Sequence, residues 1–111
     1  MKLRSLKFKS VKSTNDIAHK LIKKKNVRPT IILSEEQSKG RGTMGKKWIS
    51  KKGNLFLTIF FDMSKKKVDF KKFSVLNAHL LKSILIKKFS NKIKIKWPND
   101  LLFNGKKICG I

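Results

Sequence analysis

Apolar and polar positions alternate along several stretches of the chain, and this alternation predicts β-strands. Residues 92–97, Lys-Ile-Lys-Ile-Lys-Trp, alternate strictly, which is typical of a strand with one buried face. Residues 2–10 also alternate and predict a short edge strand. Two runs rich in β-branched and aromatic residues, 30–34 and 54–61, predict two further strands.

The dipeptide Asn104-Gly105 predicts the two-residue turn of a β-hairpin, because both residue types accept the positive φ angles that such turns need. Residues 101–103 would lead into this turn, and residues 106–111 would form the return strand. Pro98-Asn99-Asp100 interrupts the chain between residues 92–97 and this hairpin.

Two segments carry apolar residues at helical spacing. The first, 16–25, follows Ser13, which together with Asp16 resembles a capping box at the helix entrance. The second, 70–89, follows Asp69, which predicts an N-cap. The apolar stripe of the second helix would consist of Phe73, Leu76, Leu80, Ile84 and Phe89.

These elements predict an α+β fold in one small domain. We expect a mixed, largely antiparallel sheet with the helices 16–25 and 70–89 packed on one side. A chain of 111 residues with 40% hydrophobic residues can bury a modest core.

The formal net charge of +23 raises the question of a nucleic-acid partner. All but three of the 29 basic residues are lysines spread along the chain, whereas nucleic-acid readers usually rely on arginine and exposed aromatic rings. The phenylalanines lie mainly in apolar runs, which predicts that they belong to the core. We therefore expect a solvated lysine surface and no specific nucleic-acid partner, and we keep a basic nucleic-acid-binding module as an alternative.

Cysteine usage and hydropathy limit the remaining classes of protein. A single cysteine allows no internal disulfide, and no Cys/His cluster has the spacing of metal ligands. No apolar stretch is long enough for a signal peptide or a membrane span. We therefore expect a cytoplasmic protein with no membrane partner and no metal site.

Residues 38–48 form a glycine-rich, basic loop between two apolar runs. The glycine spacing resembles a dinucleotide fingerprint and falls one residue short of a P-loop, but both motifs open a helix and this loop precedes a predicted strand. The glycines still let backbone amides point into one concavity, and Arg41 can bind an anion bidentately. The loop therefore predicts anion binding, with a flexible, solvated hairpin loop as the alternative.

Three segments of the chain form a pattern in this order. They are Ser13-Thr14-Asn15 before a helix, Gly40-Arg41-Gly42-x-x-Gly45-x-x-Trp48, and Lys96-Trp97-Pro98-Asn99-Asp100 followed by Lys107-Ile108-x-Gly110-Ile111. Each alone is a weak signal, but together they cover nearly the whole chain. The pattern resembles the catalytic domain of biotin protein ligases, within the biotin/lipoate ligase family.

The resemblance implies a two-step reaction. Biotin and ATP, with Mg²⁺, would give biotinyl-5′-adenylate and pyrophosphate. A lysine of the biotin carboxyl carrier domain of acetyl-CoA carboxylase, or of a related carboxylase, would then attack the adenylate. Fixed cations and oriented amides of the loop would offset the repulsion between the biotin carboxylate and the α-phosphate.

The resemblance also implies roles for individual residues. Biotin would be bound by Ser13, Thr14, Asn15, Gln37, Gly40 and Arg41. The adenylate and ATP would be bound by Gly42, Thr43, Gly45, Lys46, Trp48, Asn99, Asp100 and Lys107. Lys107 and Arg41 would be the catalytic residues, with the Lys107 ammonium on the carboxylate and phosphate oxygens.

The chain departs from the family pattern in two respects. Thr43 stands where the family often has an arginine that helps to close the loop, so we expect weaker retention of the adenylate. Family members continue past Gly110-Ile111, so we expect residues 1–111 to be the N-terminal part of a catalytic domain, without a helix-turn-helix or β-barrel domain and with little turnover alone. A lipoate or octanoyl ligase or transferase is the nearest alternative function.

Overall fold

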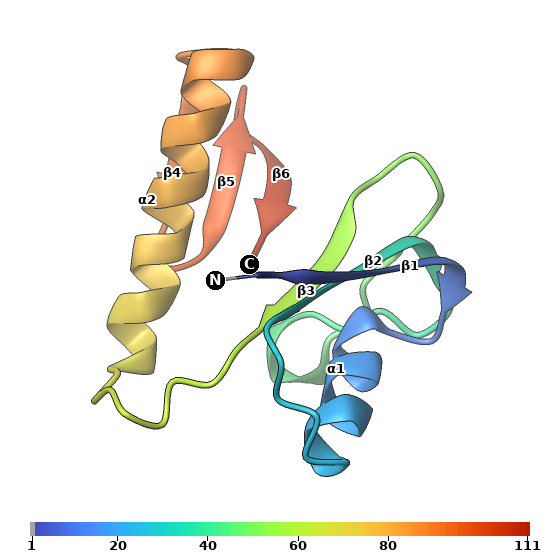
Figure 1. Cartoon of the computed structure of the whole chain (residues 1–111). Helices are drawn as coiled ribbons and strands as arrows, with labels where there is room; N and C mark the ends of the chain where they lie inside the picture. Colours follow the sequence, from blue (N-terminus) through green and yellow to red (C-terminus); the bar gives the residue numbers. More distant parts are fainter. Residues whose placement is uncertain (1) are drawn as a thin grey trace. The chain divides into compact units, whose positions relative to one another are not determined.

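The computed structural model describes residues 2–111, which form two compact units, one up to Ser64 and one from Lys65 (Figure 1). The predicted α+β class is confirmed, and the strands divide into one three-stranded sheet in each unit. The first unit contains β1 (Arg4–Val11), α1 (Thr14–Lys23), β2 (Thr30–Gln37), a 3₁₀ turn (Thr43–Gly45) and β3 (Phe56–Phe60). The second contains α2 (Phe70–Lys88), β4 (Ile93–Lys96), β5 (Asp100–Phe103) and β6 (Lys106–Gly110).

In the first unit, β2 lies between β1 and β3. β1 runs parallel to β2 with Leu6 opposite Ile32, and β3 runs antiparallel with Thr58 opposite Ile32. β1 is therefore an edge strand of this sheet, as predicted for residues 2–10. α1 connects β1 to β2 and packs against β2 and β3 on one face of the sheet (Figure 1).

The entrance of α1 differs from the prediction. Ser13 is the N-cap residue, but its side chain makes no capping hydrogen bond, so the predicted capping box is wrong. Asp16 binds Arg41 instead. The amide at the start of the helix, that of Thr14, donates to the side-chain oxygen of Gln37 at 2.8 Å. Gln37 of β2 therefore accepts a hydrogen bond from the amide at the start of the helix, where the sequence predicted a cap from a neighbouring side chain.

In the second unit, β4, β5 and β6 form an antiparallel sheet in this order. The chain reverses between β4 and β5 at residues 97–99, where the Trp97–Pro98 peptide bond is cis. The predicted interruption is therefore a hairpin turn. Asn104 and Gly105 have φ angles of 49° and 74°, which confirms the predicted two-residue turn between β5 and β6.

α2 buries a face other than the predicted one. The core of the second unit consists of Ala78, Ile93 and Leu101, and the helix also contributes Leu81, Leu85 and Ile86 to the packing around it. Leu76, Leu80 and Ile84, which belong to the predicted stripe, are 50–56% exposed. α2 is apolar around most of its circumference, so periodicity alone could not identify the face that packs on the sheet.

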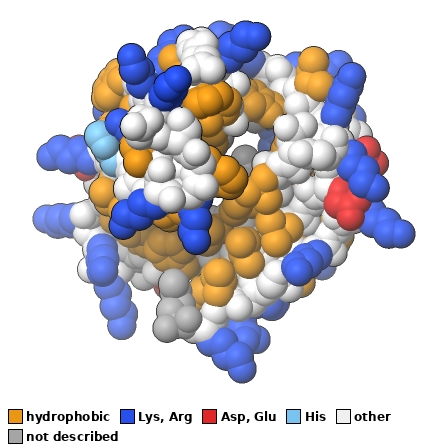
Figure 2. All heavy atoms as spheres, turned by 90° about the horizontal axis from the view of Figure 1, so that it is seen from above, with side chains coloured by type: hydrophobic (Ala, Val, Ile, Leu, Met, Phe, Trp, Pro, Cys, Tyr) orange, Lys and Arg blue, Asp and Glu red, His pale blue; other side chains and the backbone are white. Residues whose placement is uncertain are grey.

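The molecular surface is basic and also exposes apolar side chains. Figure 2 shows lysine and arginine side chains spread over the visible face, with apolar side chains between them. Phe56 is buried, but Phe70 and Phe89 are largely exposed, so the prediction that phenylalanines belong to the core is wrong at these two positions. Within residues 2–111 no helix has the length and apolar character needed to cross a membrane.

Candidate functional site

Backbone hydrogen bonds hold the base of the glycine-rich loop beside the entrance of α1. The Ser38 amide donates to the Val11 carbonyl at 3.0 Å, which joins the loop to the segment before α1. The Trp48 amide donates to the Gly40 carbonyl at 2.9 Å and closes the base. As expected for a loop that is neither a P-loop nor a dinucleotide fingerprint, a strand follows it.

The tip of the loop, residues 41–47, is a tight turn exposed to solvent. The Gly42 amide donates to the Lys46 carbonyl at 2.6 Å, and the Lys46 amide donates to the Thr43 carbonyl at 3.3 Å. Because these two amides donate inside the turn, the prediction of successive amides facing an anion is wrong for them. The basic side chains of the loop carry the positive charge that is available to a ligand.

A chain of hydrogen bonds joins the entrance of α1 to β2, to β3 and to the residues after the loop. Gln37 Oε1 accepts from the amide of Thr14 at 2.8 Å and from its hydroxyl at 3.1 Å. Gln37 Nε2 donates to Ser50 Oγ at 3.0 Å. The Thr58 hydroxyl donates to Asn15 Oδ1 at 2.6 Å and lies 2.9 Å from Thr14 Oγ1. We call these five residues the Gln37 network.

The Gln37 network is partly shielded from water: Gln37 and Thr58 are half-buried, and Asn15 is exposed. Thr14 and Ser50 are 4% and 6% exposed, and the adjacent N-cap residue Ser13 is 3% exposed. Hydroxyl groups can both donate and accept, and a carboxamide offers a carbonyl and an NH₂ group side by side. The network can therefore recognise a compact neutral group that carries donors and acceptors together, such as an amide or a urea.

Arg41 and Asp16 form an ion pair between the loop and α1. Arg41 Nη2 lies 2.6 Å from Asp16 Oδ1, and the two side chains are 45% and 33% exposed. The hydrogen bond from Arg41 holds the pKa of Asp16 below its usual value of 3.8, and Asp16 in turn raises the pKa of Arg41. Both groups are therefore charged at neutral pH.

In the second unit, Lys107 is paired with Asp100. The Lys107 Nζ atom lies 2.9 Å from Asp100 Oδ1, and the Asp100 side chain is only 18% exposed. Asn99 lies next to this pair and donates from Nδ2 to the carbonyl of Ile111 at 2.6 Å, while the Ile111 amide donates to the Asn99 carbonyl at 3.0 Å. Asp100 and Lys107, both of which the resemblance assigns to the adenylate site, are thus in direct contact.

A β-bulge determines which way Lys107 points. Leu101 pairs with Cys109, but Leu102 pairs with Lys107, so Ile108 is an extra residue in β6. Paired residues share a face of the sheet and successive residues alternate between faces. The bulge therefore turns Lys107 away from the face of Leu101 and Cys109, which packs on α2, and onto the face of its carboxylate partner.

Neither a reactive thiol nor a metal-ligand cluster occurs in the described part of the chain. Burial raises the pKa of the Cys109 thiol, and the Asp100 carboxylate raises it further. The thiol is therefore protonated at neutral pH and is a poor nucleophile. Among residues 2–111, no group of three His, Cys, Asp or Glu side chains lies close enough to hold a metal ion.

The predicted site residues fall into one group in each unit. In the first unit, Thr14, Asn15 and Gln37 share the Gln37 network, and Arg41 reaches Asp16. Thr43, Gly45 and Lys46 stay at the exposed tip of the loop and do not join the network. The predicted residues of the first unit are Ser13, Thr14, Asn15, Gln37, Gly40, Arg41, Gly42, Thr43, Gly45, Lys46 and Trp48, and those of the second are Asn99, Asp100 and Lys107.

The sequence analysis missed three residues that contact the predicted ones. Thr58 is a polar residue within an apolar strand, and this interruption of the pattern was a usable signal. Ser50 and Asp16 reach Gln37 and Arg41 only through the folded structure, and no local signal indicates this.

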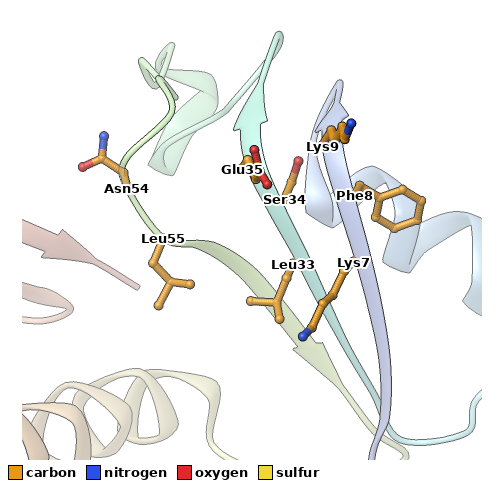
Figure 3. Close-up of a pocket in the computed structure, with 8 residues that line it drawn as sticks. All are labelled: Lys7, Phe8, Lys9, Leu33, Ser34, Glu35, Asn54 and Leu55. Atoms are coloured by element: carbon orange, nitrogen blue, oxygen red, sulfur yellow. The ribbon is translucent and has the colours of Figure 1, made fainter.

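A hollow of about 370 Å³ lies elsewhere on the first unit (Figure 3). The side chains of Lys7, Leu33 and Leu55 extend to the same side of the sheet there, whereas the Phe8 ring points away from them. None of the predicted site residues lines the hollow, so it is separate from the Gln37 network. The hollow is lined by Lys7, Phe8, Lys9, Leu33, Ser34, Glu35, Asn54 and Leu55.

The first unit thus places a partly buried polar network at the entrance of α1, beside the base of a basic, glycine-rich loop. The chain belongs to the Biotin/lipoate A/B protein ligase family, whose sequence model matches residues 7–111. This agrees with the resemblance carried by the three sequence segments.

Individual relatives support this assignment. The chain is 32% identical over 104 residues to the bifunctional ligase/repressor BirA of Bacillus spizizenii, which covers 91% of this chain and 31% of the relative. It is 33% identical over 82 residues to the biotin--[acetyl-CoA-carboxylase] ligase of Paracoccus denitrificans, covering 72% of this chain and 34% of the relative. The fold matches the biotin protein ligase from Aquifex aeolicus in complex with biotin and ATP, with a TM-score of 0.82 and 30% identity over 96% of this chain and 44% of that chain. This chain thus spans about a third of the length of these two curated relatives and less than half of the Aquifex aeolicus structure.

Proposed function

We propose that the protein is a biotin protein ligase, which activates biotin with ATP and transfers it to a lysine of a carrier protein. In the first step, a carboxylate oxygen of biotin attacks the α-phosphorus of ATP, the bond from that phosphorus to the bridging oxygen breaks, and pyrophosphate leaves. In the second step, the lysine amine attacks the carbonyl carbon of the adenylate, and AMP leaves. Family membership and the Aquifex aeolicus relative, which binds biotin and ATP, support this proposal.

The single observation that carries the proposal is the Gln37 network. The ureido ring of biotin has two N–H donors and one carbonyl acceptor, and the network offers hydroxyl and carboxamide groups of both kinds in a partly shielded place. Ser50 and Thr58 orient Gln37 and Thr14 in this assignment. The residues proposed to contact biotin are Ser13, Thr14, Asn15, Gln37, Gly40 and Arg41.

The phosphate and carboxylate groups of the reaction need cations, and each unit supplies some. In the first unit, Arg41 and Lys46 of the loop are proposed to bind these anions, with Gly42, Thr43, Gly45 and Trp48 around the adenylate. In the second unit, Lys107 is proposed to bind carboxylate and phosphate oxygens, and Asp100 orients its ammonium group from 2.9 Å. Positioned cations of this kind stabilise the charge that develops during phosphoryl transfer.

The substrates imply further partners. Mg²⁺ would accompany ATP as the counter-ion of its phosphates, with Asn99 and Asp100 near those phosphates. The carrier would be the biotin carboxyl carrier domain of acetyl-CoA carboxylase or a related carboxylase, consistent with the name of the Paracoccus denitrificans relative. Use of ATP fits the cytoplasmic location expected from the sequence.

Calorimetric titration of the chain with biotin and with biotinyl-5′-AMP tests the proposal, because binding can be measured without turnover. Gln37→Ala removes the donor and the acceptor at the centre of the network. We expect the affinity for biotin to fall about tenfold or more, since a buried polar group left unpaired costs about 1–3 kcal/mol. Glu36→Ala is the matched control, because this exposed neighbour has no side-chain partner among the described residues. Equal losses in both variants, or no biotin binding by the unaltered chain, would contradict the proposal.

The same titrations separate the alternatives. A lipoate or octanoyl ligase would bind lipoate or octanoate more tightly than biotin. A nucleic-acid-binding module would bind DNA with a strong dependence on salt and would not respond to biotin. Preference for biotin together with weak, nonspecific DNA binding supports the ligase.

A further inference from the structure

The carboxylate of Asp16 holds one end of the Arg41 guanidinium. The bond joins Oδ1 to Nη2 at 2.6 Å, and the described residues place no hydrogen-bond partner on the Nε and Nη1 atoms of Arg41. An arginine bound by one nitrogen keeps donors for a second anion. The geometry therefore fixes the direction of the guanidinium and leaves part of it able to bind a ligand.

Asp16 also connects α1 to the tip of the glycine-rich loop. Apart from this contact, the loop is attached at its base. The base is tied by backbone bonds, including those from Ser38 and Trp48. Within residues 2–111, the Asp16–Arg41 contact is the one side-chain hydrogen bond from outside the loop to its tip, residues 41–47. This ion pair therefore attaches the tip of the loop to α1.

We propose that Asp16 is a positioning residue that orients Arg41 and restrains the loop tip for binding of the biotin carboxylate and the adenylate phosphate. The inference rests on the proposed function for the identity of the ligand, but the restraint on the loop does not depend on it. Asp16 lies in the first turn of α1, where a negative charge is favourable. Asp16 acts through Arg41 and does not itself touch the ligand.

The groups around the carboxylate keep the pair formed at neutral pH. Arg41 lowers the pKa of Asp16 most strongly, and His19 and Lys20 of α1 lower it further. A carboxyl group whose pKa is lowered on folding contributes its stabilisation above its usual pKa and loses it as the pH falls through the lowered value. The restraint should therefore stay constant between about pH 5 and pH 8 and weaken only below the ordinary pKa of 3.8.

Amide hydrogen exchange of the loop tests the restraint without any ligand. The amides to follow are those of Gly42, Lys46 and Trp48, which are hydrogen-bonded inside the loop. We expect Asp16→Ala to increase their exchange rates about two- to fivefold, the range for an exposed ion pair. Asp16→Asn retains an acceptor oxygen and should restore part of the protection, and Glu36→Ala should leave it unchanged. Unchanged loop exchange in Asp16→Ala, or faster exchange confined to α1, would overturn the proposal.

A charge swap separates the restraint from ligand binding. The double variant Asp16→Arg with Arg41→Asp can form the same ion pair in reverse, so loop protection should return towards that of the unaltered chain. Binding of biotinyl-5′-AMP should stay weak, because the cation no longer belongs to the loop. If the swap restored binding as well, Asp16 would not act by orienting Arg41. If the unaltered chain bound neither biotin nor biotinyl-5′-AMP while Asp16→Ala still loosened the loop, the restraint would stand and the proposed function would fail.

Discussion

Position 40 requires glycine because of contact with its neighbours. A Cβ atom there would collide with Ser50 Oγ and would lie 2.8 Å from the Trp48 carbonyl oxygen and 3.0 Å from Gln37 Nε2. All three atoms belong to the Gln37 network or to the base of the loop, so Gly40 lets the loop pass directly over the network. Gly45, by contrast, has a φ of 73° and open space around it, so its backbone conformation is what favours glycine.

Lys107 should matter far more than the lysine beside it. Lys107 faces Asp100 because of the bulge at Ile108, whereas Lys106 is an exposed residue next to the hairpin turn. We expect Lys107→Ala to weaken binding of biotinyl-5′-AMP about ten- to a hundredfold, the range for a lost charge-assisted hydrogen bond of about 1.5–3 kcal/mol. Calorimetry measures the loss.

The matched control for this change is Lys106→Ala, which removes the same charge one residue away and should bind almost normally. Thermal unfolding of both variants shows whether Lys107→Ala acts through the fold, because it leaves the largely buried Asp100 without its partner. Similar affinities of the two variants for biotinyl-5′-AMP would show that Lys107 does not belong to the proposed site.

At the scale of elements, the start of α2 offers a direct test of a capping interaction. The Asp69 carboxylate accepts hydrogen bonds from the Lys71 amide at 3.0 Å and from the Lys72 amide at 3.4 Å. We expect Asp69→Ala to lower the free energy of unfolding by about 0.5–2 kcal/mol, measured by urea denaturation. Asp69→Asn keeps an acceptor oxygen and should lose much less; an equal loss would show that the charge, and not the cap, stabilises the helix.

The sequence predicted those elements that depend on local signals. Asp69 marks the start of α2, and Asn104-Gly105 marks the turn between β5 and β6, because a single residue or dipeptide suffices for each. The buried face of α2 was not predictable, since apolar residues surround the helix and the choice depends on how Ala78 lies against Ile93 and Leu101. The bulge at Ile108 was missed for a similar reason, because register is set by the partner strand.

For the whole molecule, the motifs predicted the residues of the candidate site better than they predicted the contacts between those residues. Thr14, Gln37 and Arg41 were all predicted from the family pattern. Their partners Ser50, Thr58 and Asp16 come from other parts of the chain, up to 44 residues away in sequence, and only folding brings them together. At Asp16, a local capping interaction and a contact with Arg41 compete for the same carboxylate. The contact with Arg41 forms, and the capping interaction does not.

The charge balance of the whole molecule predicts an unusual response to salt. The net charge is +23 with only 6 acidic residues, so repulsion between lysines outweighs the few attractions available. The ion pairs among the described residues include Arg41–Asp16, Lys52–Glu35 and Lys107–Asp100. Raising NaCl from about 0.05 to 0.5 M shortens the range of electrostatic interactions from about 14 Å to 4 Å. We therefore expect the melting temperature to rise with salt.

The lysine run Lys65, Lys66 and Lys67 provides the control, because all three are exposed and take part in no ion pair among the described residues. Replacing them with glutamine removes three positive charges without removing an attraction. The variant should melt at a higher temperature than the unaltered chain in low salt and should respond less to added NaCl. If salt instead lowered the melting temperature, the ion pairs at Asp16 and Asp100 would outweigh lysine repulsion, and net charge would not limit the stability of this fold.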